Sequence, residues 1–289
     1  MPVLFGMGVQ VLTSLVRQRI SNIVAVALDL DGTTYLSNTP LPFAIELKGF
    51  LDKKGIKVLY VTNNSSMTQQ SYVEKLARMG IPVKGHEVLV STEVAVQYIK
   101  DTIPHEKVFV VATPHVLEEI KRHGVNVVSD YKDAGCALLC FDTTIDYKKI
   151  RDLCAFVRGK GLYLATHMDI NCPTEEGFIP DVGSFLALIE ASTGRKPDFV
   201  FGKPSEFMAK AIASKVDCQN DRILYVGDRL YTDIAMANKF GMLSALVLTG
   251  ETKEEDIAKS PYKPDIVANN LGNLIEILED SMFPCPPLP

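Results

Sequence analysis

The chain has 289 residues and a net charge of −5, and 47% of its residues are hydrophobic while 22% are charged. This balance is typical of a folded protein with a sizeable core, and the length predicts two domains or one large one. An acidic chain lacks the basic field of most nucleic-acid and membrane-surface binders, so we expect neither partner.

The N-terminal segment and the cysteines predict a cytoplasmic protein. Arg17 and Arg19 follow the apolar part of the segment 1–20, whereas a secretory signal places its basic residues first. The chain has no run of about 18 apolar residues, which a membrane span needs. Its six cysteines form no C-x-x-C pair and are expected to be buried, reduced thiols. A short N-terminal helix is expected to pack on the core through one face, formed by Val11, Leu12, Leu15 and Val16.

Strands and helices then alternate, which predicts a doubly wound α/β fold with a parallel sheet. The apolar run at 23–28 predicts a strand buried on both faces, and Asp29 follows it directly. Further along this part we expect helices at 42–54, 72–77 and 94–99 and a strand at 57–62.

A second series of elements begins near Pro104 and is long enough for a smaller α/β unit of its own. Its expected strands are 108–111, 125–128, 137–141 and 162–165, and its expected helices are 116–122 and 147–157. The elements expected after it are helices at 184–191, 207–215, 234–240 and 271–278 and strands at 199–201, 223–226, 243–248 and 266–267. The tail 284–289 is rich in proline and is predicted to be disordered.

Polar residues follow four of the expected strands. The carboxyl ends of neighbouring parallel strands meet at one edge of a sheet, so these residues are expected to share one site. They are Asp29, Asp31, Thr62, Asn63, Lys203, Asp228 and Asp233.

With these residues the chain resembles the haloacid dehalogenase superfamily of phosphatases, whose four motifs occur here in order. They are D-L-D-G-T from Asp29, V-T-N-N around Thr62, F-G-K-P around Lys203 and G-D-R-L-Y-T-D from Asp228. The resemblance implies a Rossmann-like parallel-sheet core and a C2-type α/β cap inserted between the second and third motifs. We therefore expect a catalytic core at 1–103 and 198–289, and a cap at 104–197.

Longer matches indicate the NagD-like, 4-nitrophenylphosphatase-type subgroup. They are V-T-N-N-S, A-T-H-M-D, G-F-I-P-D-V-G-S-F and T-G-R-K-P-D-F-V-F-G-K-P. The chain departs from the subgroup twice, with Asp181 where Gly is usual and His167 where the pattern A-T-N has Asn. For His167 and Asp169 the sequence leaves open whether they contact substrate or only shape a loop.

The family resemblance implies a Mg²⁺-dependent phosphatase that hydrolyses small phosphate monoesters through an aspartyl-phosphate. Asp29 matches the nucleophile, because a carboxylate nucleophile divides a slow hydrolysis into two displacements. Asp31 matches the general acid and base. The resemblance gives Mg²⁺ the carboxylates of Asp29 and Asp228 and the backbone carbonyl of Asp31.

Four further residues complete the implied site. Thr62, Asn63 and Lys203 are expected to bind the phosphate oxygens, where negative charge is held during transfer. Asp233 is expected to orient Lys203 or a water on the metal.

Other functions remain open at the level of the sequence. A phosphotransferase or phosphomutase could use the same aspartyl-phosphate, although its relatives usually carry a cap between the first two motifs. A non-catalytic regulatory protein that accepts phosphate is disfavoured because Asp31 would promote rapid hydrolysis. The sequence does not distinguish sugar phosphates, nucleotides, phosphoglycolate or glycerol phosphate as the substrate, and it leaves open whether the chain forms a homodimer.

Overall fold

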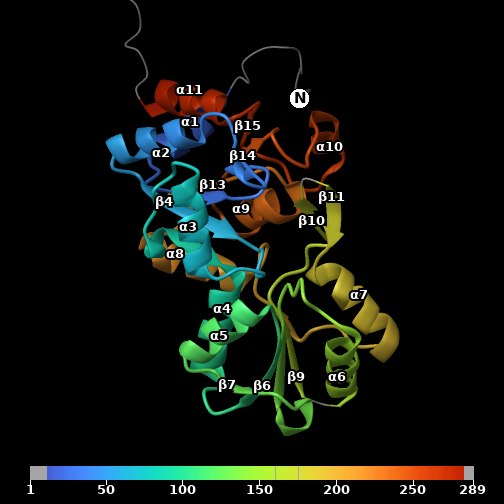
Figure 1. The fold of residues 1–289 in the computed structure, drawn as a ribbon. Coiled ribbons are helices and arrows are strands. Elements are labelled where there is room, and N and C mark those ends of the chain that lie inside the picture. The colour runs from blue at the N-terminus through green and yellow to red at the C-terminus, as the bar shows by residue number, and fades with distance from the viewer. Residues whose placement is uncertain (1–11, 160, 175, 283–289) are drawn as a thin grey trace, which may run out of the picture.

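The computed structural model describes residues 12–159, 161–174 and 176–282, which form two lobes, each built on a parallel sheet (Figure 1). The expectations for Val11, for Cys285 and for the tail 284–289 lie outside the described residues. Within them, no helix combines the length and the hydropathy needed to cross a membrane.

The larger lobe contains a six-stranded sheet in the order β15-β14-β13-β1-β4-β5, and all its neighbouring strands are parallel. Its strands are β1 (Ala25–Asp29), β4 (Lys57–Thr62), β5 (Val88–Val90), β13 (Ile223–Gly227), β14 (Leu243–Val247) and β15 (Ile266–Ala268). Because β1 lies between β13 and β4, the residues that follow these three strands meet at the carboxyl edge of the sheet.

Helices cover both faces of this sheet. They are α1 (Ser14–Ser21), α2 (Ala44–Lys53), α3 (Gln69–Arg78), α4 (Ser91–Thr102), α8 (Glu206–Val216), α9 (Ala235–Phe240), α10 (Glu254–Lys259) and α11 (Leu271–Met282). Short turns of helix occur at η1 (Gly85–Glu87), η3 (Asn220–Arg222) and η4 (Leu230–Ile234). This arrangement confirms the doubly wound fold predicted from the alternating pattern.

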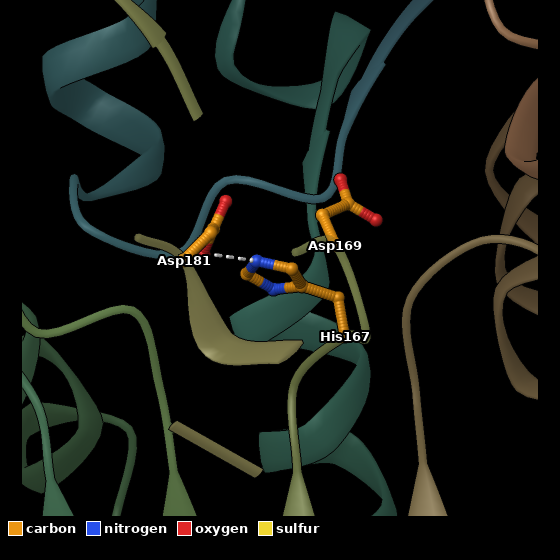
Figure 2. Close-up of side chains that lie close together, drawn as sticks. All are labelled: His167, Asp169 and Asp181. Carbon is orange, nitrogen blue, oxygen red and sulfur yellow. Dashed lines mark hydrogen bonds and ion pairs between the residues drawn. The ribbon is translucent and has the colours of Figure 1, made fainter. Parts of the chain in front are cut away.

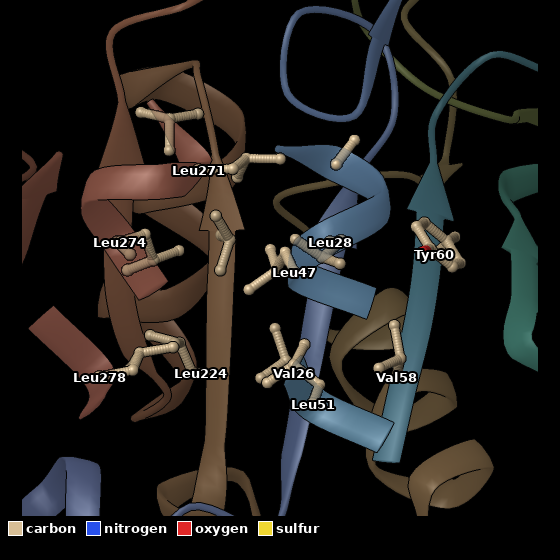
Figure 3. Close-up of a cluster of buried hydrophobic side chains, with 14 of the residues drawn as sticks. Val26, Leu28, Leu47, Leu51, Val58, Tyr60, Leu224, Leu271, Leu274 and Leu278 are labelled. Atoms are coloured by element: carbon tan, nitrogen blue, oxygen red, sulfur yellow. The ribbon is translucent and has the colours of Figure 1, made fainter. Parts of the chain in front are cut away.

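Alternate side chains of β1 enter different apolar clusters. Val26 and Leu28 pack with leucines of α2 and α11 (Figure 3), whereas Ala25 and Ala27 face α8 and α9. Each fully buried leucine contributes about 1.5–3 kcal/mol of burial free energy, so β1 is held firmly from both sides. The strand that ends at Asp29 is therefore a rigid support for that carboxylate.

The smaller lobe contains a five-stranded parallel sheet in the order β12-β9-β8-β6-β7. Its strands are β6 (Lys107–Val111), β7 (Asn126–Val128), β8 (Cys136–Leu139), β9 (Leu162–Ala165) and β12 (Phe199–Val200). Its helices are α5 (Pro114–Arg122), α6 (Tyr147–Arg158) and α7 (Val182–Thr193), with a short turn at η2 (Tyr131–Asp133). We call this lobe the cap. The antiparallel hairpin of β10 (Asn171–Thr174) and β11 (Gly177–Pro180) extends from it towards the larger lobe (Figure 1).

The chain passes between the lobes twice, and both crossings meet in one aromatic cluster. Tyr98 of α4 precedes the first crossing and contacts Phe199, Phe201 and Phe207, which lie along the second, at ring-centre distances of 5.0–5.4 Å. One apolar cluster also runs without a break from α8 into β6 and β8. The strands of the cap extend to Val200, and the exact division into 1–103, 104–197 and 198–289 stays a prediction.

The structure corrects one local expectation and adds several elements. Leu15 was expected on the buried face of the N-terminal helix, but 64% of it is exposed. Helix α1 instead packs through Val16 and Ile20, which are four residues apart and so lie on the same face. The strand β5, the helix α10, the hairpin β10–β11 and the hairpin of β2 (Tyr35–Leu36) and β3 (Thr39–Pro40) were not predicted.

Candidate active site

Asp29, Lys203 and Asp233 form a buried ionic cluster at the carboxyl edge of the larger sheet. The Lys203 ammonium donates to Asp29 Oδ1 and, at 2.7 Å, to Asp233 Oδ1. Asp233 accepts a second hydrogen bond, 3.1 Å long, from the backbone N–H of Arg229. Both carboxylates therefore share one cation, and both oxygens of Asp233 already have partners.

Asp228 lies beside this cluster and is held by two loops. Its Oδ1 accepts a 3.2 Å hydrogen bond from the Thr33 hydroxyl, and its Oδ2 accepts a 2.7 Å hydrogen bond from the backbone N–H of Glu251. The backbone passes so close that a side chain at Gly32 would lie 2.7 Å from Asp228 Oδ2, and one at Gly250 would collide with it. Gly32 also has a φ of 89°, which favours glycine.

Carboxylate oxygens of Asp29, Asp228 and Asp233 lie within 4.8 Å of one another, and all three residues are buried. Burial raises the pKa of Asp228 to about 8, and the neighbouring carboxylates of Asp29 and Asp233 add to this effect. Burial likewise raises the pKa of Asp233 to about 6, against the opposing effect of Lys203. The three carboxylates repel one another, and the single charge of Lys203 does not balance this repulsion. Such a group of buried oxygen ligands is suited to bind a hard divalent cation.

Asp31 stands apart from that cluster and faces the space below the cap. Its Oδ2 accepts a 3.4 Å hydrogen bond from the Tyr35 hydroxyl. Burial raises the pKa of Asp31, although the cations of Lys75 and Arg229 oppose the shift. A carboxyl group with a raised pKa and no lysine directly attached is suited to carry a proton.

Thr62 and Asn63 are both buried near Lys203, and the side chains of both already have partners. Thr62 Oγ1 accepts a 3.0 Å hydrogen bond from the backbone N–H of Asn64, and its hydroxyl also forms a hydrogen bond with the side chain of Tyr72. The Asn63 amide is fully engaged. It accepts from the Lys203 backbone N–H at 2.7 Å, and it donates to the Lys203 carbonyl at 3.2 Å and to Asp169 at 3.0 Å. Asn63 thus fixes the segment that carries Lys203, and the direct contact with phosphate expected for it stays a prediction.

The cap covers the site through Asp169, which contacts the larger lobe at two points. Its Oδ1 accepts from Asn63, and its Oδ2 pairs with Arg229 at 3.2 Å. Arg229 Nε also lies 3.0 Å from Glu251. Besides Asp29, Asp31, Thr62, Asn63 and Lys203, the small cavity between the lobes is lined by Asn64, Asp169, Asn171, Cys172, Pro173, Asp181 and Arg229.

No motif assigned most of these residues to the site. Arg229 lies in the larger lobe directly after Asp228, and its place within the fourth motif left a contact with substrate open. Asn171 and Cys172 belong to the hairpin β10–β11, and no sequence pattern indicates that this hairpin reaches the site.

Comparison with known proteins identifies the family. A model of haloacid dehalogenase-like hydrolases matches residues 26–126, and a second model of the same kind matches residues 200–274. A solved 4-nitrophenylphosphatase from Thermotoga maritima is 39% identical, with 89% of this chain and 98% of that chain covered and a TM-score of 0.85. The chain belongs to the haloacid dehalogenase-like hydrolases.

Two members of the family with lower sequence identity are named for phosphatase activities on other compounds. The sugar-phosphatase AraL of Bacillus subtilis is 28% identical, with 89% of this chain and 94% of the relative covered. A glycerol phosphate phosphatase from Mycobacterium tuberculosis, solved in complex with magnesium, is 27% identical over 90% of this chain and 79% of that one, with a TM-score of 0.82. The predicted NagD-like, 4-nitrophenylphosphatase-type subgroup and the predicted class of phosphoric monoester hydrolase are confirmed.

His167 and Asp181, the two residues at which this hydrolase differs from its subgroup, are in direct contact. His167 Nε2 lies 2.8 Å from Asp181 Oδ1, and both side chains are buried under the cap beside Asp169 (Figure 2). These three residues also bring a nitrogen and two carboxylate oxygens within 4.8 Å of one another. However, Arg229 already pairs with Asp169, and His167 with Asp181 Oδ1, so each of these residues has at least one partner within the protein.

Proposed function

We propose that this hydrolase is a Mg²⁺-dependent phosphatase that cleaves small phosphate monoesters through a phosphorylated Asp29. The observation that carries the proposal is the joint position of Asp29, Lys203, Asp228 and Asp233 in one buried cluster, with Asp31 facing the adjacent cavity. The magnesium in the related glycerol phosphate phosphatase supports the choice of metal.

The carboxylate cluster fits a magnesium ion by its donor set. Asp29 and Asp228 would hold the ion together with the backbone carbonyl of Asp31, and Asp233 would act through Lys203, because both its oxygens are occupied. When bound, the ion reduces the repulsion between the carboxylates and a phosphate dianion.

The protein residues divide the remaining work. Asp29 attacks phosphorus, and the P–O bond to the leaving group breaks as the new P–O bond to Asp29 forms. Asp31 gives its proton to the leaving oxygen and then takes a proton from the water that attacks the phosphorylated Asp29. Lys203 and Thr62 provide an ammonium and a hydroxyl for the phosphate oxygens. Hydrolysis returns Asp29 and releases inorganic phosphate.

The decisive experiment is hydrolysis of p-nitrophenyl phosphate with Mg²⁺, for the wild type and for Asp29→Asn. We expect the variant to lose activity by about 10⁴-fold or more, because a covalent catalyst without its nucleophile retains little activity. Asp146→Asn is the matched control, since Asp146 is exposed, caps α6 and does not line the cavity.

Either of two outcomes would contradict the proposal. One is an inactive wild type across a panel of phosphate esters, and the other is full activity of Asp29→Asn. Transfer of the phosphoryl group to an added alcohol in preference to water would instead support a phosphotransferase.

A further inference from the structure

The cavity between Asp31 and the cap is small and polar. Its volume is about 20 Å³, and carboxylates of Asp31, Asp169 and Asp181 all line it. A leaving group bonded to the transferred phosphate must lie on the Asp31 side of the site, because Asp31 is the proposed proton donor. The cap residues that face this cavity would therefore contact the leaving group.

Asp181 presents one free carboxylate oxygen to this cavity. Its Oδ1 is occupied twice, by the backbone N–H of Val182 at 2.6 Å and by His167 Nε2 at 2.8 Å. No described residue donates a hydrogen bond to Oδ2, although only 3% of Asp181 is exposed. Figure 2 shows the second oxygen of Asp181 directed away from the histidine ring.

His167 fixes the orientation of the Asp181 carboxylate from the side that faces away from the cavity. It is fully buried and does not line the cavity. Its Nδ1 lies 3.1 Å from the Thr166 hydroxyl, which lies 2.8 Å from the Ser65 hydroxyl in the loop after β4. A carboxylate oxygen accepts hydrogen bonds, so His167 donates to Asp181 through Nε2. This hydrogen-bonded series anchors Asp181 to the larger lobe.

The charges around the cavity decide which leaving groups it accepts. Two cations also line the cavity, and each already faces two other carboxylates: Arg229 faces Asp169 and Glu251, and Lys203 faces Asp29 and Asp233. A free, buried carboxylate oxygen attracts a hydroxyl that can donate to it and repels a second anionic group.

We propose that Asp181, positioned by His167, selects phosphate esters whose leaving group is a small polyol and rejects those whose leaving group carries a carboxylate. This inference rests on the proposed phosphatase function. It assigns Asp181 a direct contact with a substrate hydroxyl, whereas His167 acts only through Asp181.

The test compares three esters with the wild type, Asp181→Asn and Asp146→Asn. Glycerol phosphate carries hydroxyls, phosphoglycolate carries a carboxylate and p-nitrophenyl phosphate carries neither. In Asp181→Asn the oxygen must stay at the position that caps α7, so the atom facing the cavity becomes an uncharged NH₂ group. Asp146→Asn makes the same change at the cap of α6, away from the cavity.

We expect Asp181→Asn to lower the kcat/KM for glycerol phosphate, relative to p-nitrophenyl phosphate, by about tenfold to a hundredfold. This range corresponds to the loss of one hydrogen bond to a charged group. The same ratio for phosphoglycolate should rise severalfold, and Asp146→Asn should change neither ratio. His167→Ala should raise the KM for glycerol phosphate more than it lowers kcat, and His167→Gln, whose amide nitrogen can replace Nε2, should restore it.

The outcomes separate the failure of this inference from the failure of the proposed function. A wild type that hydrolyses none of the three esters overturns both. A wild type that prefers phosphoglycolate, or an Asp181→Asn variant that changes all three esters by one common factor, overturns the polyol assignment alone.

Discussion

At the scale of single residues, the four aspartates of the site are proposed to have different roles because their hydrogen-bond partners differ. Asp29 and Asp233 share the ammonium of Lys203, whereas Asp228 is held by a hydroxyl and a backbone N–H. Asp31 has only the phenol of Tyr35 as a hydrogen-bond donor in the described chain. Asp29 also has a single donor, but that donor is a cation, so Asp31 is the one aspartate of the four held by an uncharged side chain alone, and it is the one proposed to exchange protons.

A variant of Asp31 tests this division of roles. p-Nitrophenolate leaves without a proton, so Asp31→Asn should leave the first displacement fast and slow the attack of water by about 10²–10⁴-fold. We expect a rapid release of nitrophenol equal to the amount of enzyme, followed by slow turnover, and a phosphorylated protein trapped by acid quenching. A steady rate without this initial phase would show that Asp31 does not act in the second step.

Three motif residues of the site were predictable from the sequence because each follows a strand of the core sheet, whereas Lys203 follows β12 of the cap sheet. Asp29, Thr62 and Asp228 end or directly follow β1, β4 and β13, which are neighbours in the sheet. The engagement of the Asn63 amide was not predictable. It depends on the contact of two segments about 140 residues apart, which no local pattern encodes.

At the scale of elements, the loop after β14 completes the proposed metal site. It brings the backbone N–H of Glu251 to Asp228, and Thr249 donates a 2.8 Å hydrogen bond to the carbonyl of Gly32. No motif predicted a role for this loop, because every residue except proline carries a backbone N–H and its use cannot be read from residue type. The close approach at Gly250 and the Thr249 hydroxyl are the features of the loop that depend on residue type.

Replacing Gly250 with alanine should displace the Asp228 carboxylate and weaken magnesium binding by about tenfold to a hundredfold, the usual effect of disturbing groups that support a metal ligand. The measurement is the Mg²⁺ concentration that gives half-maximal activity. Gly49→Ala is the matched control, since a side chain at Gly49 in α2 would meet nothing within 4 Å. An unchanged Mg²⁺ requirement in Gly250→Ala would count against the role of this loop.

The cap shows where prediction of elements from the sequence reached its limit. Its strands and helices follow clear apolar periodicity and were predicted in order. The hairpin β10–β11 was not, because β11 (Gly177–Pro180) is exposed throughout and therefore lacks the buried–exposed alternation of a typical strand.

At the scale of the whole molecule, the buried carboxylates oppose folding unless protons or a metal are present. Asp228 and Asp233 have pKa values raised to about 8 and about 6, above the value of about 3.9 in an unfolded chain. Between these values the folded protein binds more protons than the unfolded chain. Its metal-free stability therefore falls as the pH rises through this range.

Magnesium should reverse that loss, and its effect should grow with pH. We expect the rise in Tm on replacing EDTA with Mg²⁺ to be at least about 3 °C larger at pH 8.5 than at pH 5.0, which corresponds to about 1 kcal/mol for a chain of this size. Thermal unfolding at the two pH values measures it, and Asp228→Asn should reduce the difference. A shift that is equal at both pH values would mean that protons and the metal do not compete for this cluster.

The aromatic cluster of Tyr98, Phe199, Phe201 and Phe207 has a consequence for how such proteins diversify. The chain enters and leaves the cap at this one place, so the two ends of the inserted segment lie side by side. A segment with adjacent ends can be lengthened, shortened or exchanged without shifting the register of the host sheet. Evolution can therefore vary the surface that reads the leaving group while the reaction site beneath it is inherited unchanged.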